Sequence, residues 1–311
     1  MKKYLYVVLL ALGLAIVTYG LALADNGPHG GFGPATDACA GCHRAHTAQA
    51  GHLLIASSTA LCQSCHGPGA TGADTNVSDG VYVSRSSSGA YGVVGDSLKG
   101  GGFANAFMDT NDNGVADGAS RATTSNHTFD GSNGTVWGNG ALNSGAGPTI
   151  SLSCGNCHNP HGRAGTGGVA TFRILRSIPT GSSASAGVDV PDPATKNYTI
   201  ANTDGARNYW NEASPSLISS WCSQCHTRYL AGIGSANNPS GDAIFTFRHT
   251  TNIAGEACMS CHVAHGTAAV MGTNSGSVPW PGGGTTPNGS ARSSLLRLDS
   301  RGVCYKCHAL P

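Results

Sequence analysis

The sequence predicts a coil-rich fold with few short helices, small hairpins and no large sheet. Glycine accounts for 46 of the 311 residues, and charged residues for only 11 %. Long stretches rich in Gly, Ser, Asn, Thr and Asp, at residues 67–153, 176–208 and 266–293, are typical of turns and irregular loops. So few apolar side chains cannot offset the backbone entropy lost on folding. We therefore expect something other than side chains to hold the chain together.

The N-terminus indicates export. Two lysines precede an apolar run that ends in Ala-Leu-Ala before Asp25, which predicts a signal peptide over residues 1–24, with an uncleaved anchor helix as the alternative. No cysteine precedes Cys39, so no lipid attachment site lies near the cleavage point. We expect a single domain over residues 25–311, secreted through the periplasm to the cell surface or medium and not inserted in a membrane. A net charge of +1 without Lys/Arg runs argues against nucleic acid as a partner.

All twelve cysteines belong to six C-x-x-C-H motifs. This motif attaches a c-type haem: both thiols bond to the porphyrin, and the histidine binds the iron as the proximal ligand. Zinc sites and disulfides do not need a histidine after every second cysteine. The sequence therefore predicts a hexahaem cytochrome c, coiled around a haem stack that supplies the missing core. Short helices are expected to start at the C-x-x-C-H motifs, with a further helix before Trp221. The motifs are Cys39, Cys42 and His43; Cys62, Cys65 and His66; Cys154, Cys157 and His158; Cys222, Cys225 and His226; Cys258, Cys261 and His262; and Cys304, Cys307 and His308.

Seven of the 13 histidines lie outside these motifs, which is enough to give every iron a second, distal histidine. A haem closed on both faces has no position for a substrate, so we expect an electron-transfer protein without catalytic residues, and not an enzyme. The candidates are His29, His46, His52, His127, His161, His249 and His265.

Three of the candidates follow a motif histidine by three residues: His46, His161 and His265. On a helical turn such residues are neighbours, so both could not bind opposite faces of one iron. We expect each to bind a different iron and to hold two haems close together. His127 and His249 are isolated where a ligand is otherwise missing, and His29 and His52 compete for the last place.

The segment "DTNDNGVADG", residues 109–118, is a candidate calcium loop. Asp109, Asn111, Asn113 and Asp117 follow the first nine positions of such a loop, with Gly114 at the turn. The twelfth position is Ser120 instead of the usual glutamate, so a plain Asx-rich turn is the favoured alternative.

The motifs form three pairs, at residues 39–66, 154–226 and 258–308. The loop-rich insert 67–153 lies between the first pair and the second. In each pair an H-x-x-H motif is followed by an aliphatic stretch ("HLLIAS", "FRILRS", "SSLLRLDSRG") and then by a plain motif. This pattern resembles the doubled C-x-x-C-H family of multihaem cytochromes. The segments "PHGGFG…CAGCHRAH", "FRHTT" and "LLRLDSRGVCYKCH" also resemble the extracellular filament-forming ("nanowire") hexahaem cytochromes of metal-reducing bacteria.

The resemblance implies alternating parallel and perpendicular haem pairs that continue through a head-to-tail homopolymer, because His46 binds a haem of the neighbouring subunit. It implies electron transfer to extracellular acceptors and exchange with outer-membrane electron conduits, and it favours His29 over His52 as a ligand. The chain departs from the family in ending three residues after the last motif. The alternatives are a monomeric periplasmic or outer-surface electron shuttle and, less favoured, a reductase with one open haem.

Overall fold

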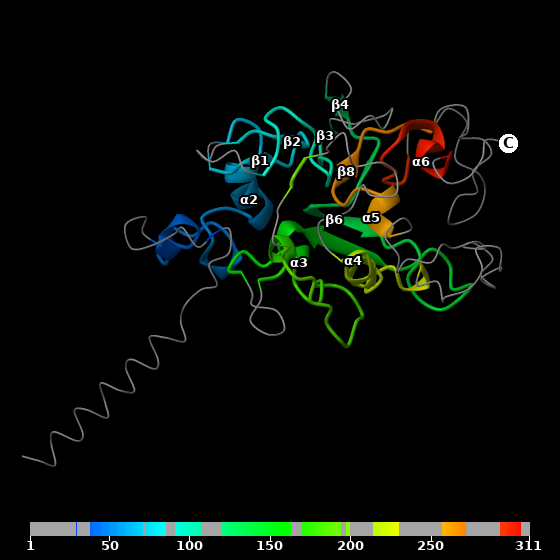
Figure 1. Ribbon diagram of the computed structural model, residues 1–311. Coiled ribbons are helices and arrows are strands. Elements are labelled where there is room, and N and C mark those ends of the chain that lie inside the picture. Colours follow the sequence, from blue (N-terminus) through cyan, green and yellow to red (C-terminus); the bar gives the residue numbers. More distant parts are fainter. Residues whose placement is uncertain are drawn as a thin grey trace, which may run out of the picture.

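The structure is a computed structural model that describes residues 29, 38–70, 72–84, 91–106, 120–162, 170–193, 197–199, 214–229, 257–271 and 293–305. Its described helices are short, and the longest, α2, has 9 residues (Figure 1). The α-helices are α2 (Ser58–His66), α3 (Cys154–Cys157), α4 (Pro215–Cys222), α5 (Cys258–Cys261) and α6 (Gly302–Tyr305). The 3-10 helices are η2 (Ala38–Gly41), η3 (Gly51–Leu53), η5 (Phe172–Ile174), η6 (Thr227–Tyr229) and η9 (Asp299–Arg301).

The strands of the described part form only two-stranded antiparallel pairs. The pairs are β1 (Thr75–Asn76) with β2 (Val81–Tyr82), β3 (Asn105–Ala106) with β4 (Arg121–Ala122), β5 (Ser125–Asn126) with β8 (Gly266–Thr267), and β6 (Asp130–Thr135) with β7 (Thr149–Ser153). The expectation of small strand pairs without a large sheet is thus confirmed for these residues, although β5 and β8 lie far apart in the sequence and form no hairpin.

The α-helices cover or adjoin the C-x-x-C segments, as the sequence predicts. The helix expected before Trp221 is α4, which begins at Pro215, where the missing N–H is not needed. In front of α3 the backbone N–H of Ser153 donates to Oδ1 of Asn156 at 2.8 Å, which caps the helix.

Two of these helices end before the motif histidine. His158 and His262 follow α3 and α5 with extended backbones, at φ/ψ of −105°/145° and −109°/153°. The interpretation of H-x-x-H as one helical turn is therefore wrong. Each helix stops at the second cysteine because the next residue, the motif histidine, forms an antiparallel bridge with the aliphatic stretch.

Side chains form only small clusters in the described part. The largest buries Phe172, Leu175, Val190, Ile218 and Met259, and a second consists of three alanines, at positions 106, 268 and 269. This packing joins the segment after the third motif to α4 and α5. It accounts for little of the chain, in keeping with the composition.

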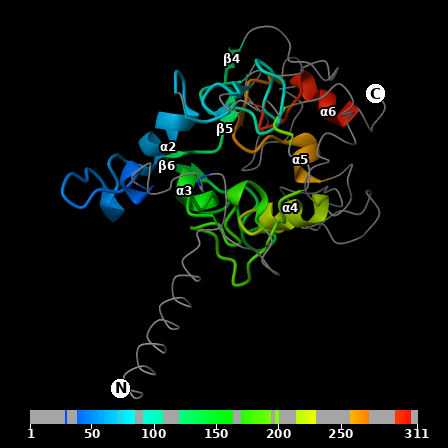
Figure 2. The ribbon, with the colours of Figure 1, turned by 60° about the vertical axis from the view of Figure 1, so that its left-hand side comes forward.

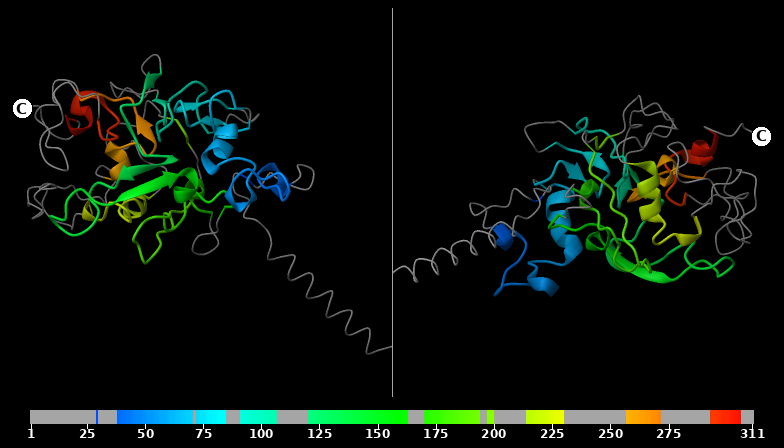
Figure 3. Two further views of the ribbon diagram at one scale, coloured as in Figure 1. Left: turned by 180° about the vertical axis from the view of Figure 1, so that it is seen from behind. Right: turned by 60° about the horizontal axis from the view of Figure 1, so that its bottom comes forward.

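The α-helices follow one another across the molecule in chain order. Figure 1 shows α2 towards one end, α3 and α4 in the middle, and α5 and α6 towards the other, and Figure 2 gives the same order. The helix α2 packs on α3, and α4 packs on α5. From behind, the N-terminal blue segment and α6 again lie on opposite sides (Figure 3). The two ends of the described chain therefore face apart.

Candidate haem-binding sites

Among the described residues, histidine rings meet in four pairs, each of which joins a motif histidine to one of the other histidines. A metal–nitrogen bond is about 2 Å long and an imidazole nitrogen lies about 1 Å from its ring centre, so two imidazoles on one iron have centres about 6 Å apart. All four separations agree with one iron between the rings. The centroid distances are 5.9 Å for His43–His161, 6.2 Å for His29–His66, 6.4 Å for His158–His265 and 6.2 Å for His127–His226.

The other ring nitrogen of every described motif histidine is hydrogen-bonded to an oxygen. Metal-binding histidines commonly donate this second N–H, because the bond fixes the ring and leaves Nε2 free to bind the metal. The Nδ1 partners are the carbonyl oxygens of His52 for His43 (2.8 Å), Arg173 for His158 (2.9 Å), Trp137 for His226 (2.6 Å) and Ser294 for His262 (3.1 Å), and Oγ1 of Thr75 for His66 (3.2 Å).

Three of these partners belong to one repeated structure, which we call the carbonyl clamp. In each copy two consecutive residues have left-handed backbones: His52 and Leu53, Arg173 and Ile174, and Ser294 and Leu295. The next residue then forms an antiparallel bridge to the motif histidine: Leu54 to His43, Leu175 to His158, and Leu296 to His262.

Left-handed backbones cost L-residues about 1–2 kcal/mol each, so such strain persists only where the surroundings impose it. In the clamp it turns a main-chain carbonyl towards Nδ1 of the motif histidine. The shared aliphatic stretches of the sequence mark these clamps. The carbonyl that accepts the bond has no side-chain signature, so sequence reasoning missed it.

The two candidates for the last distal place lie in different surroundings. The ring of His29 faces that of His66, with 6.2 Å between centres. His52 occupies the clamp position that Arg173 and Ser294 hold in the other copies, and its carbonyl accepts the bond from His43. Arginine and serine do not serve as distal haem ligands, yet they hold this position in the other two clamps. The clamp therefore needs only the backbone carbonyl of His52, and not its side chain.

Hydrogen bonds from Nδ1 also orient two of the candidate distal histidines. Nδ1 of His29 donates to the carbonyl of Pro160 at 2.8 Å, and Nδ1 of His127 donates to the carbonyl of Ala264 at 2.6 Å. Pro160 and Ala264 are the residues just before the second histidines of two H-x-x-H motifs. Each such segment therefore contacts two histidine pairs at once.

Burial keeps several of these rings neutral. It lowers the pKa of His127 and His158. Burial, with the added charges of neighbouring histidines, lowers the pKa of His226 to about 4 and that of His265 to about 3. A neutral imidazole is the form that binds a metal, so these sites suit iron.

The eleven described cysteines form no disulfides with one another, and several lie close together across the motifs. The thiols of Cys62 and Cys154 are within hydrogen-bonding reach, as are those of Cys222 and Cys258. The second motif thus lies against the third, and the fourth against the fifth. Motifs that touch in space thus belong to successive motif pairs of the sequence.

The motif cysteines differ in how far the protein covers them. Cys39, Cys65 and Cys304 are exposed. They belong to the first, second and sixth motifs, which lie towards the two ends of the described chain (Figure 1). Gly72 lies close to Cys65, because a Cβ added at Gly72 would lie 2.8 Å from the Sγ of Cys65.

The other described cysteines are half-buried. They are Cys42, Cys62, Cys154, Cys157, Cys222, Cys225, Cys258 and Cys261. Burial raises the pKa of Cys42 and Cys225, and it raises that of Cys157 to about 12. The protein thus shields the thiols of the central motifs more than those of the terminal ones.

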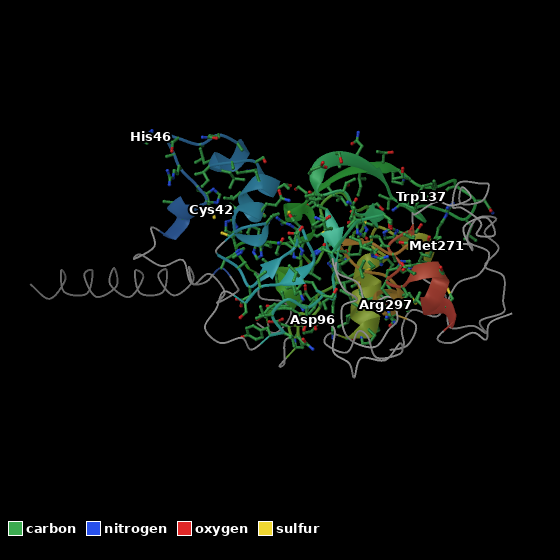
Figure 4. All side chains as sticks on the ribbon, turned by 90° about the horizontal axis from the view of Figure 1, so that it is seen from above. Cys42, His46, Asp96, Trp137, Met271 and Arg297 are labelled. Atoms are coloured by element: carbon green, nitrogen blue, oxygen red, sulfur yellow. The ribbon has the colours of Figure 1, made fainter. Side chains whose placement is uncertain are left out.

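Besides His52, two described histidines have no second imidazole opposite them among the described residues. His46 is exposed at the tip of the N-terminal segment and makes no ring contact or hydrogen bond with described residues (Figure 4). His262 has its Nδ1 partner but no second imidazole opposite it among described residues. Predicted residues outside the described ones are His249, Cys307, His308 and the calcium candidates Asp109, Asn111, Asn113 and Asp117.

Comparison with known proteins supports the chemistry of the motifs. Residues 33–71 match the doubled CXXCH motif family. No curated protein and no solved structure gives a match. Among the described residues no helix is long and apolar enough to cross a membrane. The match covers the first pair of motifs and is typical of multihaem c-type cytochromes, whose C-x-x-C-H motifs bind haem covalently and whose usual role is electron transfer.

Proposed function

We propose that the protein is a hexahaem electron conduit that polymerises head to tail outside the cell. Each haem, when bound, carries one electron by cycling its iron between two oxidation states. The cysteines and histidines of the six motifs hold the haems, and the distal histidines close their second faces, which leaves electron transfer as the function. The N-terminal sequence supports export, and extracellular acceptors and outer-membrane conduits are the proposed partners.

The chain is divided here into three units, each of which begins at an isolated histidine and ends at a plain motif: unit 1 (residues 29–66), unit 2 (127–226) and unit 3 (249–308). The haems are numbered by their motifs. Within units 1 and 2 the isolated histidine faces the plain motif histidine, as His29 faces His66 and His127 faces His226. By the same rule we propose that His249 is the distal ligand of His308 in unit 3, although both lie outside the described residues.

The observation that carries the proposal is a shift of one unit in the other pairs. His161 of unit 2 faces His43 of unit 1, and His265 of unit 3 faces His158 of unit 2. Each H-x-x-H motif thus serves the preceding unit. In this series His46 has no preceding unit whose motif histidine it could face, and His262 has no following unit to supply its distal histidine. A neighbouring subunit placed head to tail satisfies both.

The shape of the molecule supports this continuation. His46 and Met271, which belongs to unit 3, lie at opposite ends in Figure 4. Contacts between units 1 and 2 and between units 2 and 3 are of one type, with α2 on α3 and α4 on α5. A third contact of that type, between unit 3 and the next unit 1, is a heterologous interface, and such interfaces generate filaments when they do not close.

The alternatives need features that fit the structure less well. A monomeric shuttle with six closed haems needs a distal ligand for His262 from the same chain. The two remaining histidines, His46 and His52, both belong to unit 1, and His52 sits in its clamp. A reductase needs an open iron, whereas four of the motif histidines already face a second ring.

A pair of variants tests the proposal. His46→Ala should retain six haems by pyridine haemochrome assay but remain a monomer in negative-stain microscopy and sedimentation. His52→Ala is the matched control, because it removes an exposed histidine from the same segment and should leave filaments intact. Normal filaments from His46→Ala would disprove the cross-subunit ligand. Wild-type protein that stays monomeric at high concentration would favour the shuttle.

A further inference from the structure

We propose that the surroundings of His265 and Arg173 make the third haem the most easily reduced of the four whose histidine pairs the structure describes. Its two candidate ligands, His158 and His265, have ring centres 6.4 Å apart. Two features set this pair apart: the distal ring has no Nδ1 hydrogen bond to a described residue, and a permanent positive charge lies beside the proximal histidine. The inference rests on the proposed binding of haem at the third motif.

The Nδ1 nitrogen of His265 is buried and has no hydrogen-bond partner among the described residues. The carbonyl of Gly100 accepts the backbone N–H of His265 at 2.8 Å, and that of Gly101 lies near the ring without reaching hydrogen-bonding geometry. By contrast, Nδ1 of His29 donates to a carbonyl at 2.8 Å, and Nδ1 of His127 donates to another at 2.6 Å. A buried polar group without a partner is rare enough in proteins to require an explanation, and a redox role is one.

Aromatic rings cover the ring of His265. The ring of Phe103 stacks on that of His265 with 4.6 Å between centres, and the ring of Phe129 stacks on Phe103 at 4.2 Å. His161, the candidate distal ligand that faces His43, is instead exposed, so water can accept a hydrogen bond from its ring. The distal ring of the third pair therefore has no acceptor from the described residues and none from bulk water.

The positive charge belongs to Arg173 in the carbonyl clamp of unit 2. The carbonyl of Arg173 accepts the Nδ1 hydrogen of His158 at 2.9 Å. Its guanidinium is held by Tyr198, whose ring centre lies 4.0 Å from Cζ, and Nη2 donates to the carbonyl of Asn197 at 3.2 Å. The charge is close enough to act on both rings of the pair, because it adds to the effect of burial in lowering the pKa of His158 and His265.

Arg173 differs in charge from the residues at the same position in the other two clamps. They are His52 and Ser294, and neither is permanently charged, whereas an arginine guanidinium is always protonated in proteins. A fixed positive charge stabilises the reduced iron, which carries one positive charge less than the oxidised iron. A missing Nδ1 hydrogen bond acts in the same direction, because such a bond strengthens the ligand and favours the oxidised metal. An electron that reaches these four sites therefore rests on the third.

Gly100 allows the missing hydrogen bond to be added. Its backbone is not left-handed, and a Cβ added there would lie 3.4 Å from Nδ1 of His265, which is an ordinary van der Waals contact. Gly100→Ser places a hydroxyl one bond further on, where it can accept the Nδ1 hydrogen. Gly100→Ala is the matched control, because it adds the same Cβ without an acceptor.

A second pair of variants tests the charge. Arg173→Gln removes the charge but keeps a long polar side chain, and the clamp uses only the backbone carbonyl of this residue. The matched control is Arg121→Gln, which removes the same charge from β4, where Arg121 is exposed and pairs with Asp299 at 3.4 Å.

The measurement is EPR-monitored potentiometry of the assembled holoprotein, with haem content checked by pyridine haemochrome. Gly100→Ser and Arg173→Gln should each lower the potential of one low-spin haem, and in the wild type that haem should titrate above at least three others. We expect about a tenfold change in its ratio of reduced to oxidised form at a fixed potential, or about 59 mV.

The controls decide each part separately. No shift in Gly100→Ser, or an equal shift in Gly100→Ala, would overturn the role of His265. No shift in Arg173→Gln, or an equal shift of the same haem in Arg121→Gln, would overturn the role of Arg173. A shifting haem that titrates below three others would overturn the proposed order. Wild-type protein with fewer than six haems would instead contradict the proposed function.

Discussion

His52→Gly separates the two candidates for the distal ligand of the second haem. His52 has φ of 60°, a backbone that costs an L-residue about 1–2 kcal/mol and glycine almost nothing. Glycine also adds freedom to the unfolded chain, worth about 0.4–1 kcal/mol. The difference predicts a stabilisation of about 0.5–1 kcal/mol, or a rise in Tm of about 1–3 °C. Because only the carbonyl of His52 contacts His43, the haems of assembled filaments should all stay low-spin in this variant.

The matched variant is His29→Ala, which removes the ring opposite His66. One haem of the six predicted by the motifs should then become high-spin and bind CO. The assay is a CO difference spectrum of the holoprotein, normalised to total haem by pyridine haemochrome, with a thermal melt on the same samples. The reasoning is refuted if His52→Gly yields a CO-reactive haem and His29→Ala does not.

Three further changes test the sites and the core. Gly266→Ala should disturb the pairing of β5 with β8 and make a haem CO-reactive, because the new Cβ would lie 2.3 Å from a carbonyl oxygen. Gly51→Ala is the control: its Cβ meets nothing within 4 Å, so the variant should behave as wild type in the same CO assay. Phe172→Ala should lower the free energy of unfolding by about 3–5 kcal/mol in guanidinium titrations with the haems retained, since the ring is 3 % exposed in the main cluster. Replacing Cys154 and Cys157 together by alanine should remove one sixth of the covalently bound haem after denaturing electrophoresis; an unchanged haem content would contradict attachment at this motif.

The sequence was informative where covalent chemistry dictates spacing. The C-x-x-C-H motifs predicted the short helices at their cysteines, because a chain that must place two thiols and a histidine around one porphyrin has little choice of local structure. The scarcity of apolar side chains likewise predicted small clusters and small hairpins. The exposure of Cys65 was not predictable in this way, because it depends on which segments pack over the end of the molecule.

The pairing of histidines was beyond sequence reasoning. Spacing indicated that His158 and His161 serve different irons, but nothing in the sequence shows that His161 meets His43, because that contact depends on how whole units pack. The helical turn assumed for this spacing was wrong, since α3 ends at Cys157. The carbonyl clamps were also hidden, because strained backbones at Arg173 and Ile174 leave no trace in residue type.

The most direct test of the central claim is the fraction of CO-reactive haem in separated wild-type subunits and in filaments of the same protein. We predict one sixth of the haem to be reactive in separated subunits, because His262 lacks its distal partner there, and none in filaments, where His46 of the neighbour supplies it. Six low-spin, unreactive haems in separated subunits would contradict the account.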